Sequence, residues 1–190
     1  SNDRSKTADL KLGTISIDYY EDLFSPSITA KMRVVNTGDT IAAEGEKERQ
    51  SLYNGLPLRG GERLSMKILD HGKTGAGEDK KGLDFTDPDR NLIVSSITDV
   101  ISESQRESFI LNLVSREAIS NETTRVFKKY SAKISTSVET ILKDVLATET
   151  DRYEVDDTSN DYQFIGNLRK PFTILVWLAS KSVLDKSGDT

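Results

Sequence analysis

The chain has 190 residues, 35% of them hydrophobic and 30% charged, which is enough to bury a core in one domain or slightly more and excludes a disordered protein. The net charge of -5 argues against a protein that mainly binds nucleic acid, because such a protein normally carries a clustered basic surface. The sequence has no cysteine, so disulfides, thiol chemistry and thiolate-rich zinc sites are excluded, which suits assembly in a reducing cytoplasm.

The N-terminal segment 1–9 is polar, and we expect it to be flexible. It has neither the apolar core nor the cleavage site of a signal peptide, and no run in the chain approaches the roughly 18 apolar residues of a membrane span. We therefore expect no membrane binding by this chain. Because the sequence begins with Ser1 rather than methionine, we also expect that it has been trimmed or processed at that end.

Hydrophobic alternation predicts the first two strands. In residues 10–20 the alternation changes phase near Gly13, which is typical of a β-bulge. Residues 27–36 alternate without interruption and predict a half-buried antiparallel strand, with Ile28, Ala30, Met32 and Val34 on its inner face.

The next strands are predicted at residues 63–69, 83–86 and 91–102, and a turn then leads into a strand through Phe109 and Val114. The last two long strands form a hairpin in this interpretation. Apolar residues fall on both faces of the final strand, so we expect both faces to be covered. The order of elements predicts the α+β class, with a mainly antiparallel twisted sheet or small β-barrel and flanking helices.

The C-terminal part is predicted to be helical. A turn is expected at residues 118–121, followed by a basic segment and an amphipathic helix. Thr136 and Glu139 fit a capping box at the start of that helix. The turn-rich residues 156–161 are of the kind that joins subdomains. A last helix is predicted to begin at Pro171, whose missing N–H costs nothing there, and Trp177 is expected to anchor it.

Three motifs in this order resemble the baseplate hub and tube-like structural proteins of contractile-tailed bacteriophages. The first is the turn Leu58 to Glu62 that leads into alternating apolar residues, and the third is the segment 167–178, with Pro171, Phe172 and Trp177. The second motif runs through the centre of the chain. Its matching positions are Leu111, Leu113, Ser115, Glu117, Ile119, Asn121, Arg125, Lys128, Tyr130, Ser131, Ile134, Val138, Ile141 and Leu142.

The resemblance implies a tube-like β domain at residues 10–120 and a helical, incomplete second hub subdomain at residues 121–190. It implies a non-enzymatic virion protein of the tail baseplate, which forms the hub ring between tail tube and spike and is assembled in the host cytoplasm. A tail-tube or tail-completion protein is the alternative within this class. A homotrimer is favoured over a hexamer, with tube and spike proteins as partners and DNA only passing through the channel. No cofactor or metal is implied.

Four basic residues on predicted strands are candidates for the channel or for contacts between subunits: Lys31, Arg33, Arg63 and Lys67. A sheet with one charged face and an open edge can pair with copies of itself and so close a ring. These side chains would then lie at the contacts or along the channel.

Motifs for catalysis or cofactor binding are weak. Gly72, Lys73 and Thr74 match the end of a phosphate-binding loop, but its first glycine is replaced by Lys67, and His71 is the sole histidine, so no two-histidine metal site exists. Acidic pairs such as Asp87 and Asp89 lie in predicted turns. A role in forming the turn explains them more simply than calcium binding or acid–base catalysis does.

Two functions of other classes stay open. The segment from Arg125 to Lys133 interleaves cations with Phe127 and Tyr130, as a module for single-stranded nucleic acid would, although a solvated helical face whose rings enter the core explains it as well. A cell-wall-degrading baseplate hydrolase would need two acids that converge in a cleft.

Overall fold

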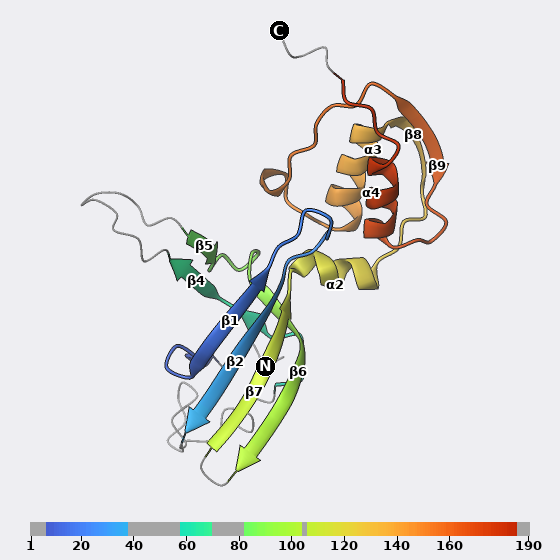
Figure 1. Ribbon diagram of the computed structural model, residues 1–190. Helices are drawn as coiled ribbons and strands as arrows, with labels where there is room; N and C mark the ends of the chain where they lie inside the picture. Colours follow the sequence, from blue (N-terminus) through green and yellow to red (C-terminus); the bar gives the residue numbers. More distant parts are fainter. Residues whose placement is uncertain (1–6, 38–57, 70–81, 104–105, 186–190) are drawn as a thin grey trace, which may run out of the picture. The chain divides into compact units, whose positions relative to one another are not determined.

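The computed structural model describes residues 7–37, 58–69, 82–103 and 106–185. The chain divides into two compact units, residues 1–116 (unit 1) and 117–190 (unit 2). Unit 1 is built from strands, whereas unit 2 combines helices with a two-stranded sheet (Figure 1). The α+β class with a mainly antiparallel sheet is thereby confirmed. Most of the segment 1–9 lies outside the described residues.

A curled five-stranded sheet forms the body of unit 1 (Figure 1). All its neighbouring strands are antiparallel, in the spatial order β1-β2-β7-β6-β3. The strands are β1 (Thr14–Tyr20), β2 (Thr29–Thr37), β3 (Arg63–Leu64), β6 (Leu92–Glu103) and β7 (Arg106–Val114). The long strands β6 and β7 pair with each other as the predicted hairpin.

The core of unit 1 lies on one face of this sheet. Its buried apolar residues are Ala30, Met32, Val34, Leu92, Val94, Phe109, Leu111 and Leu113. The alternation predicted for residues 27–36 is confirmed. The prediction that both faces of β7 are covered is wrong, because Ile110 and Val114 are only half-buried. Beside them, β2 and β6 place polar side chains such as Arg33 and Thr98 on the same face.

The register of the sheet shifts at three places, one of them between Val94 and Ser96 of β6. The register of β1 shifts between Thr14 and Ser16, next to Gly13, which confirms the predicted bulge. Another shift, between Thr98 and Ile101 of β6, surrounds Asp99 with a φ of 54°. Such left-handed backbone is tolerated by aspartate, but no pattern in the sequence predicts it there.

The prediction of a single strand at residues 63–69 is wrong. The chain forms β3, which pairs with β6, and then β4 (Met66–Leu69), which pairs with β5 (Gly82–Phe85) in a separate two-stranded sheet. Leu64 and Met66 still pack against the core. The alternation therefore continues across Ser65 while the pairing partner changes.

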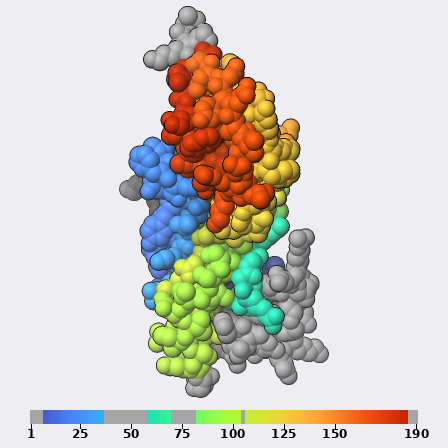
Figure 2. Space-filling model, turned by 90° about the vertical axis from the view of Figure 1, so that its right-hand side faces the viewer, coloured from blue at the N-terminus to red at the C-terminus, as the bar shows by residue number. Residues whose placement is uncertain are grey.

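Unit 2 packs helices against a two-stranded antiparallel sheet of β8 (Lys129–Lys133) and β9 (Asp161–Ile165). Its helices are α2 (Arg116–Thr123), α3 (Ile134–Thr140), a π-helical turn (Ile141–Val145), a 3-10 turn (Thr150–Arg152) and α4 (Pro171–Ala179). The buried core consists of Val126, Tyr130, Ile134, Ile141, Phe164, Ile174 and Leu178. In the space-filling view, the yellow-to-red residues of unit 2 form one closely packed body (Figure 2).

Three predictions for this part are corrected. Residues 118–121 lie inside helix α2 rather than in a turn, and the basic segment ends in strand β8 rather than in a helical face. The predicted amphipathic helix begins at Ile134 and turns from α to π geometry at Ile141. There, the N–H of Leu146 donates to the carbonyl of Ile141 at 3.1 Å, which is the spacing of five residues that defines a π turn.

The predicted capping box of Thr136 and Glu139 is also wrong. Helix α3 begins at Ile134, directly after β8, so its N-cap residue is Lys133, three residues before Thr136, and Lys133 makes no capping bond with its side chain. Instead, the N–H of Ser135 donates to Oγ1 of Thr158 at 3.0 Å, and the N–H of Thr158 donates to Oγ of Ser135 at 3.3 Å. A residue 23 positions away therefore supplies the cap.

Helix α4 begins at Pro171 as predicted, and it too is capped from a distance. The N–H of Phe172 donates to Oδ1 of Asn121 at 2.8 Å, across 51 positions of sequence. Asn121 is buried, so this bond ties α2 to the start of α4. Trp177 packs edge-on against Tyr162 and Phe164, with ring centroids 5.4 and 5.6 Å away, which agrees with its expected anchoring role.

Replacing Thr158 with valine is expected to lower the free energy of unfolding of unit 2 by about 1–3 kcal/mol. The shape of the side chain is kept, but the buried N–H of Ser135 loses its acceptor. Chemical unfolding followed by the fluorescence of Trp177, the sole tryptophan, measures the change. The same substitution at the exposed Thr173 is the control and should change stability by less than about 0.5 kcal/mol. Equal effects of the two variants would contradict the proposed cap.

Candidate functional site

The outer face of the five-stranded sheet carries three of the four predicted basic residues. Lys31 and Arg33 are exposed on β2, two residues apart and therefore on the same face. The register continues this face across the sheet, because Thr29 pairs with Val114, Val114 with Ile93, and Ile93 with Arg63. Arg63 therefore lies on the same face, on the far strand β3.

The fourth residue, Lys67, does not lie in this sheet. It belongs to β4, where its Nζ lies 2.9 Å from Oδ2 of Asp84 on β5. Hydrogen bonds from Thr86, and then the bond from Lys67, hold the pKa of the Asp84 carboxyl well below its usual range. Because both side chains are about half exposed, this pair contributes little to stability.

Polar side chains hold the centre of the outer face together. The side-chain amide of Asn112 on β7 donates to the hydroxyls of Ser96 and Thr98 on β6, each at 3.2 Å. The hydroxyl of Ser95 donates to the carbonyl of Asn112 at 3.0 Å. Lys31 pairs in register with Asn112, so a cationic row runs beside a neutral, hydrogen-bonded one.

Strand β1 forms an edge of the sheet, since it pairs with β2 and with no other described strand. Apolar side chains are exposed just before it, along it and in the turn that follows. Their exposed fractions are 99% for Leu12, 64% for Ile15, 52% for Tyr20, 94% for Leu23 and 91% for Phe24. An edge strand that exposes apolar side chains is a surface on which another chain can pack.

The turn after β1 is a feature that the sequence analysis missed. The carbonyl of Asp22 accepts the N–H of Ser25 at 3.0 Å, and its Oδ1 accepts the N–H of Phe24 at 2.9 Å. Leu23 and Phe24 are thus held at the two central positions of a turn. An aspartate three residues before a serine that precedes proline could have indicated it.

The carboxylate of Glu21, just before this turn, accepts a hydrogen bond from a tyrosine hydroxyl. The hydroxyl of Tyr19 donates to Oε2 of Glu21 at 3.0 Å. Partial burial, and then this bond to a carboxylate, raises the pKa of Tyr19 to about 12. The carboxylates of Glu21 and Asp22 therefore lie on a fixed stretch of backbone beside two exposed apolar side chains.

Another acidic pair, Asp87 and Asp89, also forms a turn. Oδ1 of Asp87 accepts the N–H of Asp89 at 3.0 Å, and Oδ1 of Asp89 lies 3.2 Å from the guanidinium of Arg116. This confirms the turn interpretation of Asp87-Pro88-Asp89. Among the described residues, no group of three or more acidic or histidine side chains is placed to hold a metal ion.

The basic segment does not present two rings beside its cations. Tyr130 is buried and stacks on Phe164 with ring centroids 4.8 Å apart, whereas Phe127 is 68% exposed. Lys128 lies 3.7 Å from Asp144, and Lys133 lies 3.6 Å from Asp185. The structure corrects the expectation that both rings enter the core. The phosphate-loop-like residues 71–74 lie outside the described residues.

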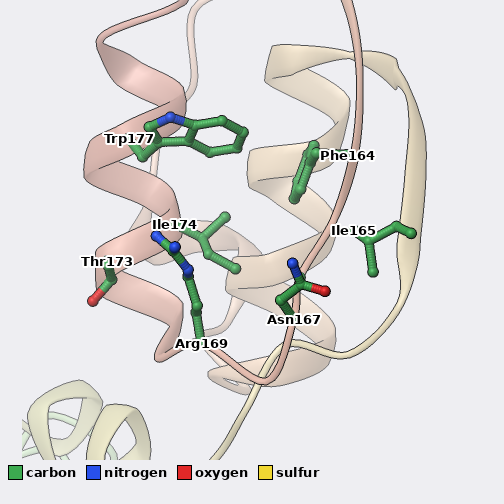
Figure 3. Close-up of a pocket in the computed structure, with 8 residues that line it drawn as sticks. Phe164, Ile165, Asn167, Arg169, Thr173, Ile174 and Trp177 are labelled. Carbon is green, nitrogen blue, oxygen red and sulfur yellow. The ribbon is translucent and has the colours of Figure 1, made fainter.

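Unit 2 contains an open pocket between the end of β9 and helix α4 (Figure 3). Its volume is about 230 Å³, and its lining residues are Phe164, Ile165, Gly166, Asn167, Arg169, Thr173, Ile174 and Trp177.

Among the described helices, none has the length and apolar character needed to cross a membrane.

No family model matches the sequence, and no curated protein matches it. Among solved structures, the chain is similar to the E. coli c3393 protein, which is described as a component of the type VI secretion system with structural similarity to the T4 bacteriophage tail proteins gp27 and gp5. The TM-score is 0.48 and the identity 14%, over 95% of this chain and 42% of that one. This chain therefore spans less than half of that protein's length, and the likeness establishes no function for it.

Proposed function

We propose that the chain is a non-enzymatic structural component of a phage-tail baseplate, in which three copies form the central hub ring between tail tube and spike. Three motifs of the phage family occur in the right order in the sequence, and the curled antiparallel sheet is of the kind that this resemblance implies. On this proposal the protein resides in the virion tail, is assembled in the host cytoplasm, and contacts tube and spike proteins.

The observation that carries the proposal is the edge strand β1 with its exposed apolar residues. An edge strand has backbone N–H and C=O groups that can pair with another chain, and Ile15 and Tyr20 add apolar area to such a contact. Repeated contacts of this kind close into a ring when the rotation between copies divides the full circle. Ring formation would also remove the open edge.

The basic outer face fits passage of DNA through such a ring. Lys31, Arg33 and Arg63 lie on one face of the sheet, and the side chains between them are neutral, whereas the exposed Asp18 of β1 pairs in register with Lys31 on its other side. A surface of this kind attracts phosphates without reading bases. On this proposal the three residues face the channel, while Lys67, paired with Asp84, lies away from it.

The native mass of the purified chain, measured by light scattering over a range of concentrations, tests the proposal. We expect a trimer; a hexamer would favour the tail-tube alternative. A chain that stays monomeric at high concentration would contradict ring formation. The double variant Lys31→Glu/Arg33→Glu should keep its native mass if these residues face the channel, and should lose assembly if they lie at contacts. Lys129→Glu, a charge reversal at an exposed position in unit 2, is the matched control.

A further inference from the structure

The pocket of unit 2 combines aromatic walls with unpaired polar groups. Trp177 and Phe164 line one side, and Arg169 reaches from the turn after β9 toward Ile174 (Figure 3). Among the described residues, no carboxylate forms an ion pair with Arg169, and no hydrogen-bond partner is present for the side chains of Asn167 and Thr173. The pocket thus offers a cation and two polar groups beside an apolar surface.

The turn that carries Arg169 is rigidly built. Asn167 and Leu168 both have left-handed backbone, with φ of 48° and 57°, which is uncommon for leucine. The N–H of Leu168 donates to the carbonyl of Val126 at 2.9 Å, and the N–H of Val126 donates to the carbonyl of Arg169 at 3.0 Å. The position of the Arg169 backbone is therefore fixed before any ligand binds, which reduces the entropy cost of binding.

The turn after β1 in unit 1 has the complementary chemistry. Phe24 and Leu23 are almost fully exposed, and the carboxylates of Glu21 and Asp22 directly precede them. The hydrogen bonds within the turn fix its backbone, and the side chain of Phe24 is exposed. An acidic, apolar turn on one unit thus matches a basic, aromatic pocket on the other.

We propose that Phe24 of one copy binds in the pocket of unit 2 of a second copy, where Glu21 and Asp22 face Arg169. A cavity of about 150 Å³ holds a benzene ring in another protein, so about 230 Å³ has room for a phenyl ring. Edge-to-face contacts with Trp177 and Phe164 would favour the ring there. The contact rests on the self-association that the proposed function requires, but not on the role in a phage tail.

A peptide of residues 19–27, acetylated and amidated at its ends, tests the contact when titrated into the full chain carrying Phe24→Ala. This variant leaves the pocket without its proposed occupant, and its fold should be intact because Phe24 is exposed. We expect the emission of Trp177, the sole tryptophan, to change on saturable binding. The peptide with Phe24→Ala should bind at least about tenfold more weakly, since burial of the ring is lost.

Charge reversal provides the second arm of the experiment. Arg169→Glu, combined with Phe24→Ala in the chain, should weaken binding of the wild-type peptide by about tenfold or more. A peptide with Glu21→Lys should restore binding to that variant, and it keeps Asp22, whose Oδ1 accepts the N–H of Phe24 in the turn. Restoration would assign the ionic contact to these partners, because a misfolded pocket could not recover in this way.

Three results would overturn the proposal: no change in Trp177 emission with the wild-type peptide, equal binding of the Phe24→Ala peptide, or an emission difference between the wild-type and Phe24→Ala chains that persists unchanged on dilution. The last would place Phe24 in the pocket of its own copy. A trimer without peptide binding would refute the contact and leave the ring. Peptide binding by an oligomer of neither three nor six copies would support the contact and refute the ring.

Discussion

Replacing Phe109 with alanine is expected to lower the free energy of unfolding of unit 1 by about 3–5 kcal/mol. Phe109 is 1% exposed and lies on the central strand β7, with β2 on one side and β6 on the other. Removal of its ring leaves a cavity that these strands cannot collapse to fill, because each is fixed by its ladder of hydrogen bonds. Chemical unfolding followed by circular dichroism, which reports the sheet, measures the loss.

Phe24→Ala is the matched control for this experiment. The same atoms are removed, but from a side chain that is 91% exposed in the single chain, so at a protein concentration low enough to keep the copies apart the free energy of unfolding should change by less than about 0.5 kcal/mol. A loss below about 1 kcal/mol in Phe109→Ala would show that β7 is not the centre of the core. A large loss in Phe24→Ala would show that the turn after β1 is buried within the isolated chain.

Replacing Gly166 with alanine is expected to destabilise unit 2 by about 3 kcal/mol or more. A Cβ atom at this position would lie 2.4 Å from the carbonyl oxygen of Val126, and both groups belong to backbone that a rotamer change cannot move. Val126 is fully buried, and its carbonyl also accepts the N–H of Leu168. Relief of the clash therefore breaks the bonds that close the turn. Unfolding followed by Trp177 fluorescence measures the effect.

Leu168→Asn is the control in the same turn. Asparagine tolerates left-handed backbone better than leucine does, and Leu168 is 67% exposed, so we expect a neutral or slightly stabilising change. Comparison of the two variants distinguishes backbone crowding at Gly166 from a general sensitivity of the turn to substitution. If Gly166→Ala unfolded within about 1 kcal/mol of the wild type, the close approach of the turn to Val126 would be refuted.

The sequence predicted those elements whose signal lies within a few residues. Alternation in residues 27–36 identified β2 and its inner face, and the position of Pro171 identified the start of α4. Each of these signals reflects a local cause: the two-residue period of a strand, or the missing N–H of proline.

The remaining features depend on residues far apart in the sequence. Ser135 and Phe172 find their capping acceptors 23 and 51 positions away, so a search for a local capping box could only fail. Likewise, alternation runs through Ser65 unchanged while the chain passes from one sheet to another. The exposure of Phe24 could not be predicted either, because apolar character alone does not tell which side chains the fold leaves exposed to solvent.

The π-helical turn at Ile141–Val145 contains one residue more than an α-helical turn would need. A π turn takes about one residue more than an α turn to cover a similar angle, so Ile141 and Leu146, five positions apart, both reach the interior. The chain can therefore lose one residue between them by reverting to α geometry, and the segments on either side keep their rotational phase. Elsewhere in a packed helix, an insertion or deletion of one residue rotates the residues that follow it away from their buried face.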